Sequence, residues 1–265
     1  MSDAASAGAS EEIHRLWDEL SDFDANQAEL ASRRLMTFLC ELVGARNATW
    51  AGAVRMGDNG DGDLLRGWRV AALQALHPAA ERPPEGPAEG HFRDIMRVWD
   101  RREMDPSFLL PLRGVGTFRT YSFRRDLPAA WFETPFYRHH YASIGAHDVV
   151  FVAFPLNEDC ESHFAFYCAG PIGDAEIARL AYALRGIKWF HRRLMLSHGL
   201  LTASSPLTPT ERRVLQLLLT EASEKHVAHQ LGLAVSTTHQ HVASIFRKFG
   251  VRSRAGLMSA WLRQG

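Results

Sequence analysis

The stretch that decides the fold of the C-terminal part of this chain is SEKHVAHQLGLAVSTTHQHVASIFRKFG, residues 223–250. Its pattern predicts a short helix, a tight turn at residues 231–233 and a second helix. Side chains suited to a core recur every three or four residues along the second helix. They are Thr238, Val242, Ile245 and Phe249. The side chains on the opposite face are short or polar. Such side chains are better suited to contact base edges in a DNA groove than to form an ordinary solvated surface.

The flanking segments predict that this helix pair belongs to a unit of four helices. Residues 208–211 (TPTE) form a capping box with proline at the first helical position, so a helix should begin there and run to about residue 220. Ser223 is a natural N-cap for the next helix. Ser253 can cap a final helix. Its inward side chains should be Leu257, Met258, Trp261 and Leu262.

Residues 207–254 resemble the LuxR-type helix-turn-helix domain of bacterial transcription regulators. The matching residues are Leu207, Thr208, Glu211, Val214, Leu215, Ser223, Lys225, Val227, Ala228, Leu231, Gly232, Leu233, Thr237, His241, Val242, Ile245, Lys248, Phe249, Gly250, Val251, Ser253 and Arg254. The resemblance implies an all-α tetrahelical fold, double-stranded DNA as a partner, and a homodimer on a roughly palindromic operator. The departures are Glu221 for glycine, Ala234 for a serine N-cap, Thr238 for valine and His239 for a DNA-contacting lysine.

The outward face of the second helix, together with the resemblance, predicts the DNA contacts. We expect His239 and Gln240 to read base edges, and Arg247 and Lys248 to hold phosphates. The full predicted set is Lys225, Ser236, Thr237, His239, Gln240, His241, Ala243, Arg247, Lys248, Arg252 and Arg254. Because lysine is absent at His239, a second class of function stays open, namely a protein-interaction module whose tetrahelical tail no longer binds DNA specifically.

The distribution of charge separates two parts of the chain. Residues 204–265 hold eight lysines and arginines against three glutamates, a net charge of +5. Residues 1–203 hold the remaining 22 cations and 27 carboxylates, a net charge of −5, so the neutral total hides a basic tail on an acidic body. Chance scatter of surface charge is the alternative explanation. Beside the helix-turn-helix pattern, the asymmetry favours DNA contact through the C-terminal part alone.

The sequence predicts five segments, with an α+β N-terminal domain ahead of the all-α C-terminal domain. They are an N-terminal tail (1–24), a sensor-like domain (25–173), a connecting helix (174–199), a linker (200–206) and the helix-turn-helix domain (207–265). The succession of elements in the N-terminal domain is similar to that of the GAF and PAS sensor folds, with a mainly antiparallel sheet. Such a domain would sense a small-molecule effector or a partner. The sequence does not favour an acyl-homoserine-lactone pocket. Two sets of residues match the spacing of that family only loosely, namely Trp99 to Asp105 and Pro106, or Trp131 with Tyr137, Tyr141 and Asp148.

Hydrophobic periodicity places the elements of the N-terminal domain. Helices are expected at residues 25–43, 92–102 and 129–143, strands at 48–56, 67–73, 149–155 and 162–169, an extended segment at 116–123, a turn at 57–63 and an exposed loop at 77–90. In the first helix the expected buried side chains are Leu30, Leu35, Phe38, Leu39 and Leu42.

The connecting helix carries apolar positions in alternating steps of three and four residues. They are Ile177, Leu180, Leu184, Ile187, His191 and Leu194. Such a heptad seam would pair with its copy in a second chain. The alternative is a helix that packs on its own sheet. Both arrangements can hold together, because Tyr182, Trp189 and Phe190 supply a second apolar side.

Aromatic side chains of the N-terminal domain could line a pocket for a flat or apolar ligand. The predicted pocket residues are Trp131, Phe136, Tyr137, Tyr141, Phe151, Phe164 and Phe166. Cys160, His163 and Cys168 could supply metal ligands, but positions 163 and 168 fall on opposite faces of a strand, so we predict no metal. No nucleophile-base pair, paired carboxylates or phosphate loop stands out, so we predict neither an enzyme nor a cofactor.

Three cysteines are too few and too odd in number for a disulfide scaffold, which suits a reducing cytoplasm. The first twelve residues, MSDAASAGASEE, lack the basic and apolar parts of a signal peptide. No apolar run is long enough to cross a membrane. The sequence therefore predicts a cytoplasmic protein with no membrane partner.

Overall fold

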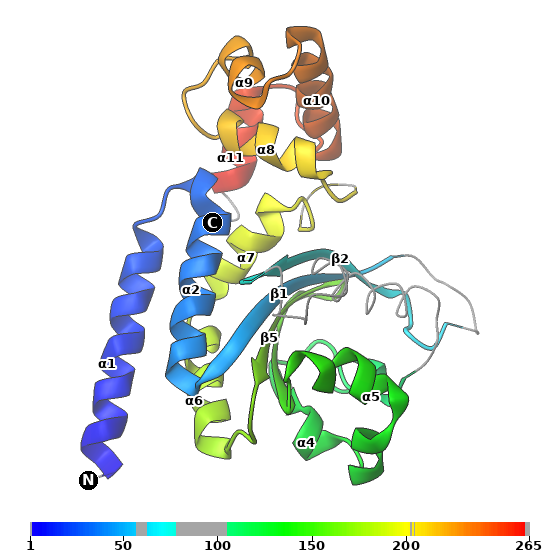
Figure 1. Cartoon of the computed structure of the whole chain (residues 1–265). Helices are drawn as coiled ribbons and strands as arrows, with labels where there is room; N and C mark the ends of the chain where they lie inside the picture. Colours follow the sequence, from blue (N-terminus) through cyan, green and yellow to red (C-terminus); the bar gives the residue numbers. More distant parts are fainter. Residues whose placement is uncertain (1, 57–62, 78–104, 202, 204, 263–265) are drawn as a thin grey trace. The chain divides into compact units, whose positions relative to one another are not determined.

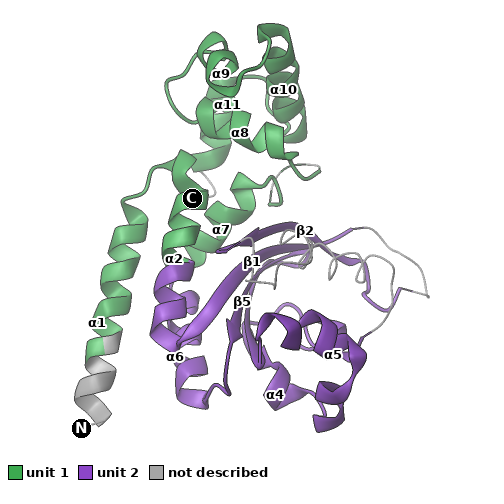
Figure 2. Cartoon of the chain, in the orientation of Figure 1, with its two compact units in different colours: residues 1–35, 187–265 green, residues 36–186 purple. Residues whose placement is uncertain are grey.

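A computed structural model of the chain describes residues 2–56, 63–77, 105–201, 203 and 205–262. The chain forms two compact units, residues 36–186 and residues 1–35 with 187–265 (Figures 1 and 2). Almost all of the turn predicted at 57–63 and of the loop predicted at 77–90, and the whole helix predicted at 92–102, lie outside the described residues.

The unit of residues 36–186 is built on a five-stranded sheet of order β2-β1-β5-β4-β3. The strands are β1 (Ala45–Arg55), β2 (Trp68–Ala75), β3 (Arg119–Ser122), β4 (Asp148–Asn157) and β5 (Cys160–Cys168). Every neighbouring pair is antiparallel, which confirms the predicted α+β class with an antiparallel sheet. The hairpins β1-β2 and β4-β5 are those that the alternating patterns indicated.

Every residue of the central strand β5 is buried, so both faces of the sheet are covered. One face packs against α6 (Asp174–Arg185) and the C-terminal half of α2 (Ala28–Val43), as the purple ribbon of Figure 2 shows. Short elements lie over the other face, namely η2 (Pro106–Leu109), α4 (Phe123–Asp126), η3 (Ala129–Glu133), α5 (Pro135–His140) and η4 (Ala142–Ile144). Several of these short elements line the pocket described below.

The single helix predicted at residues 129–143 is wrong, because the structure has three short pieces there, η3, α5 and η4. Pro135 causes the first break. A proline disfavours helical geometry in the residue before it, and Thr134 is extended at φ −70 and ψ 150. The hydroxyl of Thr134 then caps α5 by accepting from the amide of Tyr137. The extended segment predicted at 116–123 is a strand only at β3.

The continuous connecting helix predicted at residues 174–199 is also wrong. The structure has α6 and α7 (Lys188–Ser197), with the break at Gly186 and Ile187, where the backbone of Ile187 leaves the helical region (φ −112, ψ 48). The predicted seam is buried within the single chain. Its members Ile177, Leu180, Leu184, Ile187, His191 and Leu194 are 0–5 % exposed. The interchain seam is therefore wrong, and the alternative of packing within one chain holds.

The segment expected to be an N-terminal tail is helical over α1 (Ser2–Ser21). Ile13, Leu16 and Leu20 recur at helical spacing and are all buried, which is why the polar start of the chain still forms an ordered helix. Glu19 of α1 accepts two hydrogen bonds from Arg34 of α2, at 2.6 and 2.8 Å. Between them, η1 (Ala25–Gln27) precedes α2, so the helix predicted to begin at residue 25 begins at Ala28.

Packing on α2 follows the predicted stripe only in part. Leu35 and Leu39 are buried as expected, and Phe38 and Leu42 are partly buried. Leu30 is 55 % exposed, so its predicted burial is wrong. Ala31 lies on the buried side of the helix in its place.

The C-terminal domain has the four predicted helices, α8 (Pro209–Leu218), α9 (Glu224–Leu231), α10 (Val235–Lys248) and α11 (Arg254–Leu262). The capping box is formed, with the Glu211 amide 3.2 Å from Thr208 Oγ1 and the Thr208 amide 2.8 Å from the Glu211 carboxylate. Gly232 makes the turn between α9 and α10 at φ 65, a conformation that glycine adopts without strain.

An apolar cluster at the centre of these helices fixes their packing. Its buried members are Leu196, Leu207, Val214, Leu215, Leu218, Val227, Val242, Ile245, Phe249, Leu257 and Trp261. The predicted inward stripe of α10 is confirmed, because Thr238 is also fully buried. The inward position predicted for Leu262 is wrong, since this side chain is 78 % exposed. Leu196 of α7 belongs to the same cluster. The amide of Leu207 donates a hydrogen bond to the carbonyl of His198 (3.1 Å), so this bond joins the residues that flank the predicted linker at 200–206.

Candidate nucleic-acid interface and internal pocket

The solvent face of α10 is the first candidate site. Ser236, His239, Gln240, Ala243 and Arg247 are all exposed on it, as the sequence predicted, and they recur at helical spacing. Thr237 and His241 are partly buried beside them. From neighbouring segments, Lys225 of α9 and Arg252, which precedes α11, are also exposed.

The exposed ring of His239 makes a contact that the sequence did not predict. Its Nδ1 lies 3.0 Å from a carboxylate oxygen of Glu224, which belongs to the first turn of α9. The two residues are 15 positions apart, so only the packing of α9 against α10 brings them together. An ionised carboxylate only accepts hydrogen bonds, so Nδ1 carries hydrogen and Nε2 is the ring atom directed away from this pair.

Two cations from the predicted DNA-binding set are used inside the domain instead. Lys248 donates to the carboxylate of Glu211 (2.7 Å) and to the carbonyl of Pro206 (2.8 Å), and its side chain is only 17 % exposed. Arg254 donates to the carbonyls of Leu218 (2.8 Å), Ala222 (2.7 Å) and Thr220. These carbonyls end α8 and begin the next loop, so Arg254 satisfies acceptors that the helix leaves open.

The buried carboxylate of Glu211 connects several segments of this domain through hydrogen bonds. Burial opposes its ionisation, but hydrogen bonds from Lys248, the Thr208 amide and Ser244 outweigh that effect and lower its pKa to about 2. One carboxylate thus joins the start of α8 to the middle and the end of α10, and it fixes where the outward face of α10 lies.

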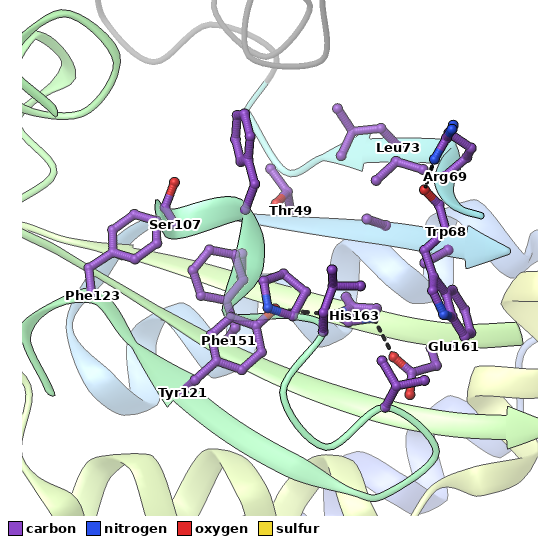
Figure 3. A pocket seen from close by; sticks show the side chains of 18 of the residues that line it. Thr49, Trp68, Arg69, Leu73, Ser107, Tyr121, Phe123, Phe151, Glu161 and His163 are labelled. Atoms are coloured by element: carbon purple, nitrogen blue, oxygen red, sulfur yellow. Dashed lines mark hydrogen bonds and ion pairs between the residues drawn. The ribbon is translucent and has the colours of Figure 1, made fainter. Parts of the chain in front are cut away.

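The second candidate site is an internal pocket of about 140 Å³ in the unit of residues 36–186 (Figure 3). Its floor is one face of the sheet, where odd-numbered residues of β1 and β5 point inward. The other walls come from η2, the loop after it, β2, β3, β4, Phe123 and Tyr141. The lining residues are Thr49, Ala51, Ala53, Trp68, Arg69, Val70, Leu73, Ser107, Phe108, Pro111, Leu112, Val115, Tyr121, Phe123, Tyr141, Phe151, Glu161, His163, Ala165 and Tyr167.

A buried polar network borders this pocket. The carboxylate of Glu161 receives two hydrogen bonds from Arg119 (2.9 and 2.8 Å), one from the Gly116 amide (2.8 Å), and lies 3.0 Å from Nε2 of His163 (Figure 3). Burial opposes ionisation of Glu161, but the bonds from His163, Arg119 and Gly116 lower its pKa to about 2. The hydroxyl of Tyr121 lies 3.4 Å from Nδ1 of His163, and burial raises the pKa of this phenol.

Of the seven predicted pocket residues, Tyr141 and Phe151 lie in the lining. Trp131 and Tyr137 are buried in the aromatic cluster behind it, with Phe136 packed against them, and the indole of Trp131 donates to Asp105 (2.9 Å). Phe164 and Phe166 are fully buried on the opposite face of the sheet, so placing them in the pocket was wrong. They are even-numbered residues of β5, and side chains alternate between the faces of a strand.

Sequence reasoning missed the polar lining. Glu161, His163, Ala165 and Tyr167 occupy alternate positions of β5, a spacing that could have placed them together on one face.

The candidate metal ligands Cys160, His163 and Cys168 lie on two faces of β5. The two cysteines have even numbers and His163 has an odd number, so the cysteines point to the face opposite His163. Among the residues that the structure describes, no three potential ligands converge as a metal site would require. Likewise, none of the described helices is long and apolar enough to cross a membrane.

Comparison with known proteins agrees with the geometry of the C-terminal domain. Residues 205–260 match the family model of bacterial regulatory proteins, luxR family. The chain is 37 % identical over 62 residues to the transcriptional regulatory protein MctR of Rhizobium johnstonii, covering 23 % of this chain and 29 % of MctR. It is 32 % identical over 59 residues to the spore germination protein GerE of Bacillus subtilis, covering 22 % of this chain and 80 % of GerE.

Among solved structures, Escherichia coli SdiA aligns over 96 % of this chain and 97 % of its own, with 12 % identity and a TM-score of 0.49. The VqsR LBD domain of Pseudomonas aeruginosa aligns over 69 % of this chain and 96 % of its own, with 13 % identity and a TM-score of 0.47. The match to MctR spans less than a third of that protein, whereas the match to GerE spans most of it. By the family model and the match to GerE, the chain belongs to the luxR family of bacterial regulatory proteins, and residues 205–260 form its helix-turn-helix domain.

Proposed function

We propose that the protein is a transcription regulator that binds double-stranded DNA by placing α10 in the major groove. The observation that carries this proposal is the solvent face of α10, where short and polar side chains replace the glutamates and lysines of an ordinary solvated helix. A net charge of +5 on residues 204–265 supplies the attraction to a polyanion. We propose no catalytic role, and we propose a cytoplasmic location because the proposed partner is DNA.

The exposed residues divide into two roles in this proposal. Gln240 and His239 read base edges, with Nε2 of His239 as the reading atom because Glu224 holds Nδ1. Ala243 lets the helix approach the bases closely. The phosphate contacts are then Lys225, Ser236, Thr237, His241, Arg247 and Arg252, whereas Lys248 and Arg254 serve the stability of the domain.

The N-terminal domain supplies the regulation in this proposal. Its pocket is partly open and lies between the sheet on one side and short helices on the other, an arrangement that suits a small-molecule site. We propose that a small ligand bound there changes the affinity for DNA. We also propose that a homodimer binds a roughly palindromic operator, since two copies of α10 related by a twofold axis would read two half-sites.

The experiment that tests the proposal is recovery of genomic fragments by the purified full-length chain, followed by fluorescence anisotropy on the enriched sequence. Gln240→Ala should weaken binding to this sequence by about 1–3 kcal/mol and leave binding to random DNA almost unchanged. Gln216→Ala, on α8, is the control and should change neither. If no sequence is enriched, the tetrahelical domain is a protein-interaction module, and equal losses on both DNAs would remove Gln240 from base reading.

A further inference from the structure

The pocket is partly open, and its volume and walls favour a small apolar occupant. Its volume is about 140 Å³, close to that of an engineered apolar cavity of about 150 Å³ that accepts benzene. The walls are mainly apolar, and seven of the 20 lining residues are aromatic. Tyr121 and Phe151 are stacked with their ring centroids 4.7 Å apart and their planes within 10°, and Phe123 packs against Phe151 at 5.3 Å. A single flat ring therefore matches both the volume and the surface.

The charged groups at the pocket are already compensated, which argues against a charged occupant. The carboxylate of Glu161 has about four acceptor positions, and Arg119, Gly116 and His163 direct four donors at them. The other charged lining residue, Arg69, donates to Asp63 (3.0 Å) and to the carbonyl of Trp68 (2.7 Å). An ionised ligand would lose its hydration without gaining an opposite charge in return.

One polar group in the lining lacks a partner. The side-chain hydroxyl of Ser107 is buried, with the residue 4 % exposed, and makes no hydrogen bond within the described part of the chain. Its backbone is fixed, because its amide donates to the carboxylate of Asp105 at 2.9 Å. A buried hydroxyl without a partner is unfavourable, and Ser107 is one of the residues that line the pocket.

We propose that this pocket binds a neutral molecule with one aromatic ring and one hydrogen-bonding oxygen, such as a small phenol, whose oxygen pairs with the Ser107 hydroxyl. The ring lies against the aromatic wall that includes Tyr121 and Phe151. This proposal rests on the proposed function, in which the same pocket is the sensory site. It names the class of effector from the charge balance, the volume and the unpaired hydroxyl.

The test is isothermal titration calorimetry on the full-length chain with four compounds of nearly the same shape. They are p-cresol, toluene (which lacks the oxygen), 4-methylcyclohexanol (which lacks the aromatic ring) and 4-methylbenzoate (which is charged). We expect p-cresol to bind about fivefold or more tightly than toluene, as one neutral hydrogen bond provides. Binding of 4-methylcyclohexanol should be weaker than that of p-cresol, and binding of 4-methylbenzoate should be absent. Tighter binding of 4-methylbenzoate, or no binding by any of the four, overturns the proposal.

Two serine variants locate the site. Ser107→Ala should lower the affinity for p-cresol about fivefold and leave that for toluene unchanged, because it removes only the hydroxyl. Ser32→Ala is a matched control, since the Ser32 hydroxyl on α2 is also buried and without a partner in the described chain but lies outside the pocket lining. It should leave both affinities unchanged. Equal effects of the two variants would contradict a contact between Ser107 and the ligand.

The same samples separate this inference from the proposed function. DNA binding is measured by anisotropy on the enriched genomic sequence, with and without p-cresol. If the protein selects a DNA sequence but binds none of the four compounds, the ligand class is wrong and the DNA-binding function stands. If p-cresol binds through Ser107 but no DNA is selected, the ligand class is right and the proposed function fails.

Discussion

At the scale of single residues, two neighbouring cations at the end of α10 have different roles. Lys248 is paired with the buried carboxylate of Glu211, whereas Arg247 is exposed. Lys248→Met should lower the free energy of unfolding by about 2–3 kcal/mol. This is less than the about 3–5 kcal/mol for breaking a fully buried pair, because Lys248 keeps some contact with solvent. Arg247→Ala should weaken DNA binding and leave stability unchanged.

Urea unfolding and DNA anisotropy on both variants measure these effects separately. Adding Glu211→Gln to Lys248→Met removes the unpaired charge, so the double variant should recover part of the lost stability. If Lys248→Met were as stable as the wild type but bound random DNA more weakly, Lys248 would be a phosphate contact after all.

The same glutamate makes the stability of the C-terminal domain depend on acid. The pKa of Glu211 is lowered from 4.5 to about 2, so its ionised form is stabilised by folding. That contribution is complete above about pH 4.5 and is lost as the pH falls towards 2. Glu211→Gln should flatten the dependence of urea-unfolding stability on pH between 4.5 and 2. Glu221→Gln, at an exposed position of the same domain, should leave that slope as in the wild type.

At the scale of elements, two glycines with the same backbone conformation differ in their surroundings. Gly232, between α9 and α10, has φ 65 and nothing within 4 Å of an added Cβ. Gly199, after α7, has φ 73, and an added Cβ would lie 2.7 Å from Cγ of Leu207. Gly232→Ala should cost about 1–2 kcal/mol of strain alone. Gly199→Ala should cost distinctly more, because Leu207 belongs to the apolar cluster of the domain.

Thermal unfolding of the two variants compares the cost of backbone strain alone, in Gly232→Ala, with the cost of strain plus a steric clash, in Gly199→Ala. If Gly199→Ala were as stable as Gly232→Ala, the close contact between residue 199 and Leu207 would not be maintained in solution. DNA binding by the folded Gly232→Ala protein then shows whether the turn also sets the position of α10.

At the scale of the whole molecule, the break between α6 and α7 changes what the apolar positions of this region do. Leu184 is fully buried within one chain, so it is not available to a second copy. Leu184→Glu should therefore abolish folding, because it buries an unpaired charge. Ala178→Glu, at an exposed position of the same helix, should fold normally. Circular dichroism and sedimentation distinguish these outcomes. A folded, monomeric Leu184→Glu protein would instead support the hypothesis of a seam between two chains.

The sequence alone determined the C-terminal domain almost completely. Its four helices, capping box, glycine turn and inward stripe on α10 depend on contacts between residues three or four positions apart, which periodicity and capping rules describe. The two hairpins of the sheet were predicted for the same reason, since alternation along a strand is also local.

Only the tertiary structure decided which polar groups meet. The side-chain hydrogen bonds of Glu211 with Lys248, Glu224 with His239 and Glu161 with Arg119 join residues 37, 15 and 42 positions apart. It also decided that the apolar stripe of α6 and α7 is covered by the chain itself, because periodicity shows that a face is buried but not what covers it. The pocket depends on several strands and short helices at once, and no local pattern in the sequence specifies how they surround a cavity.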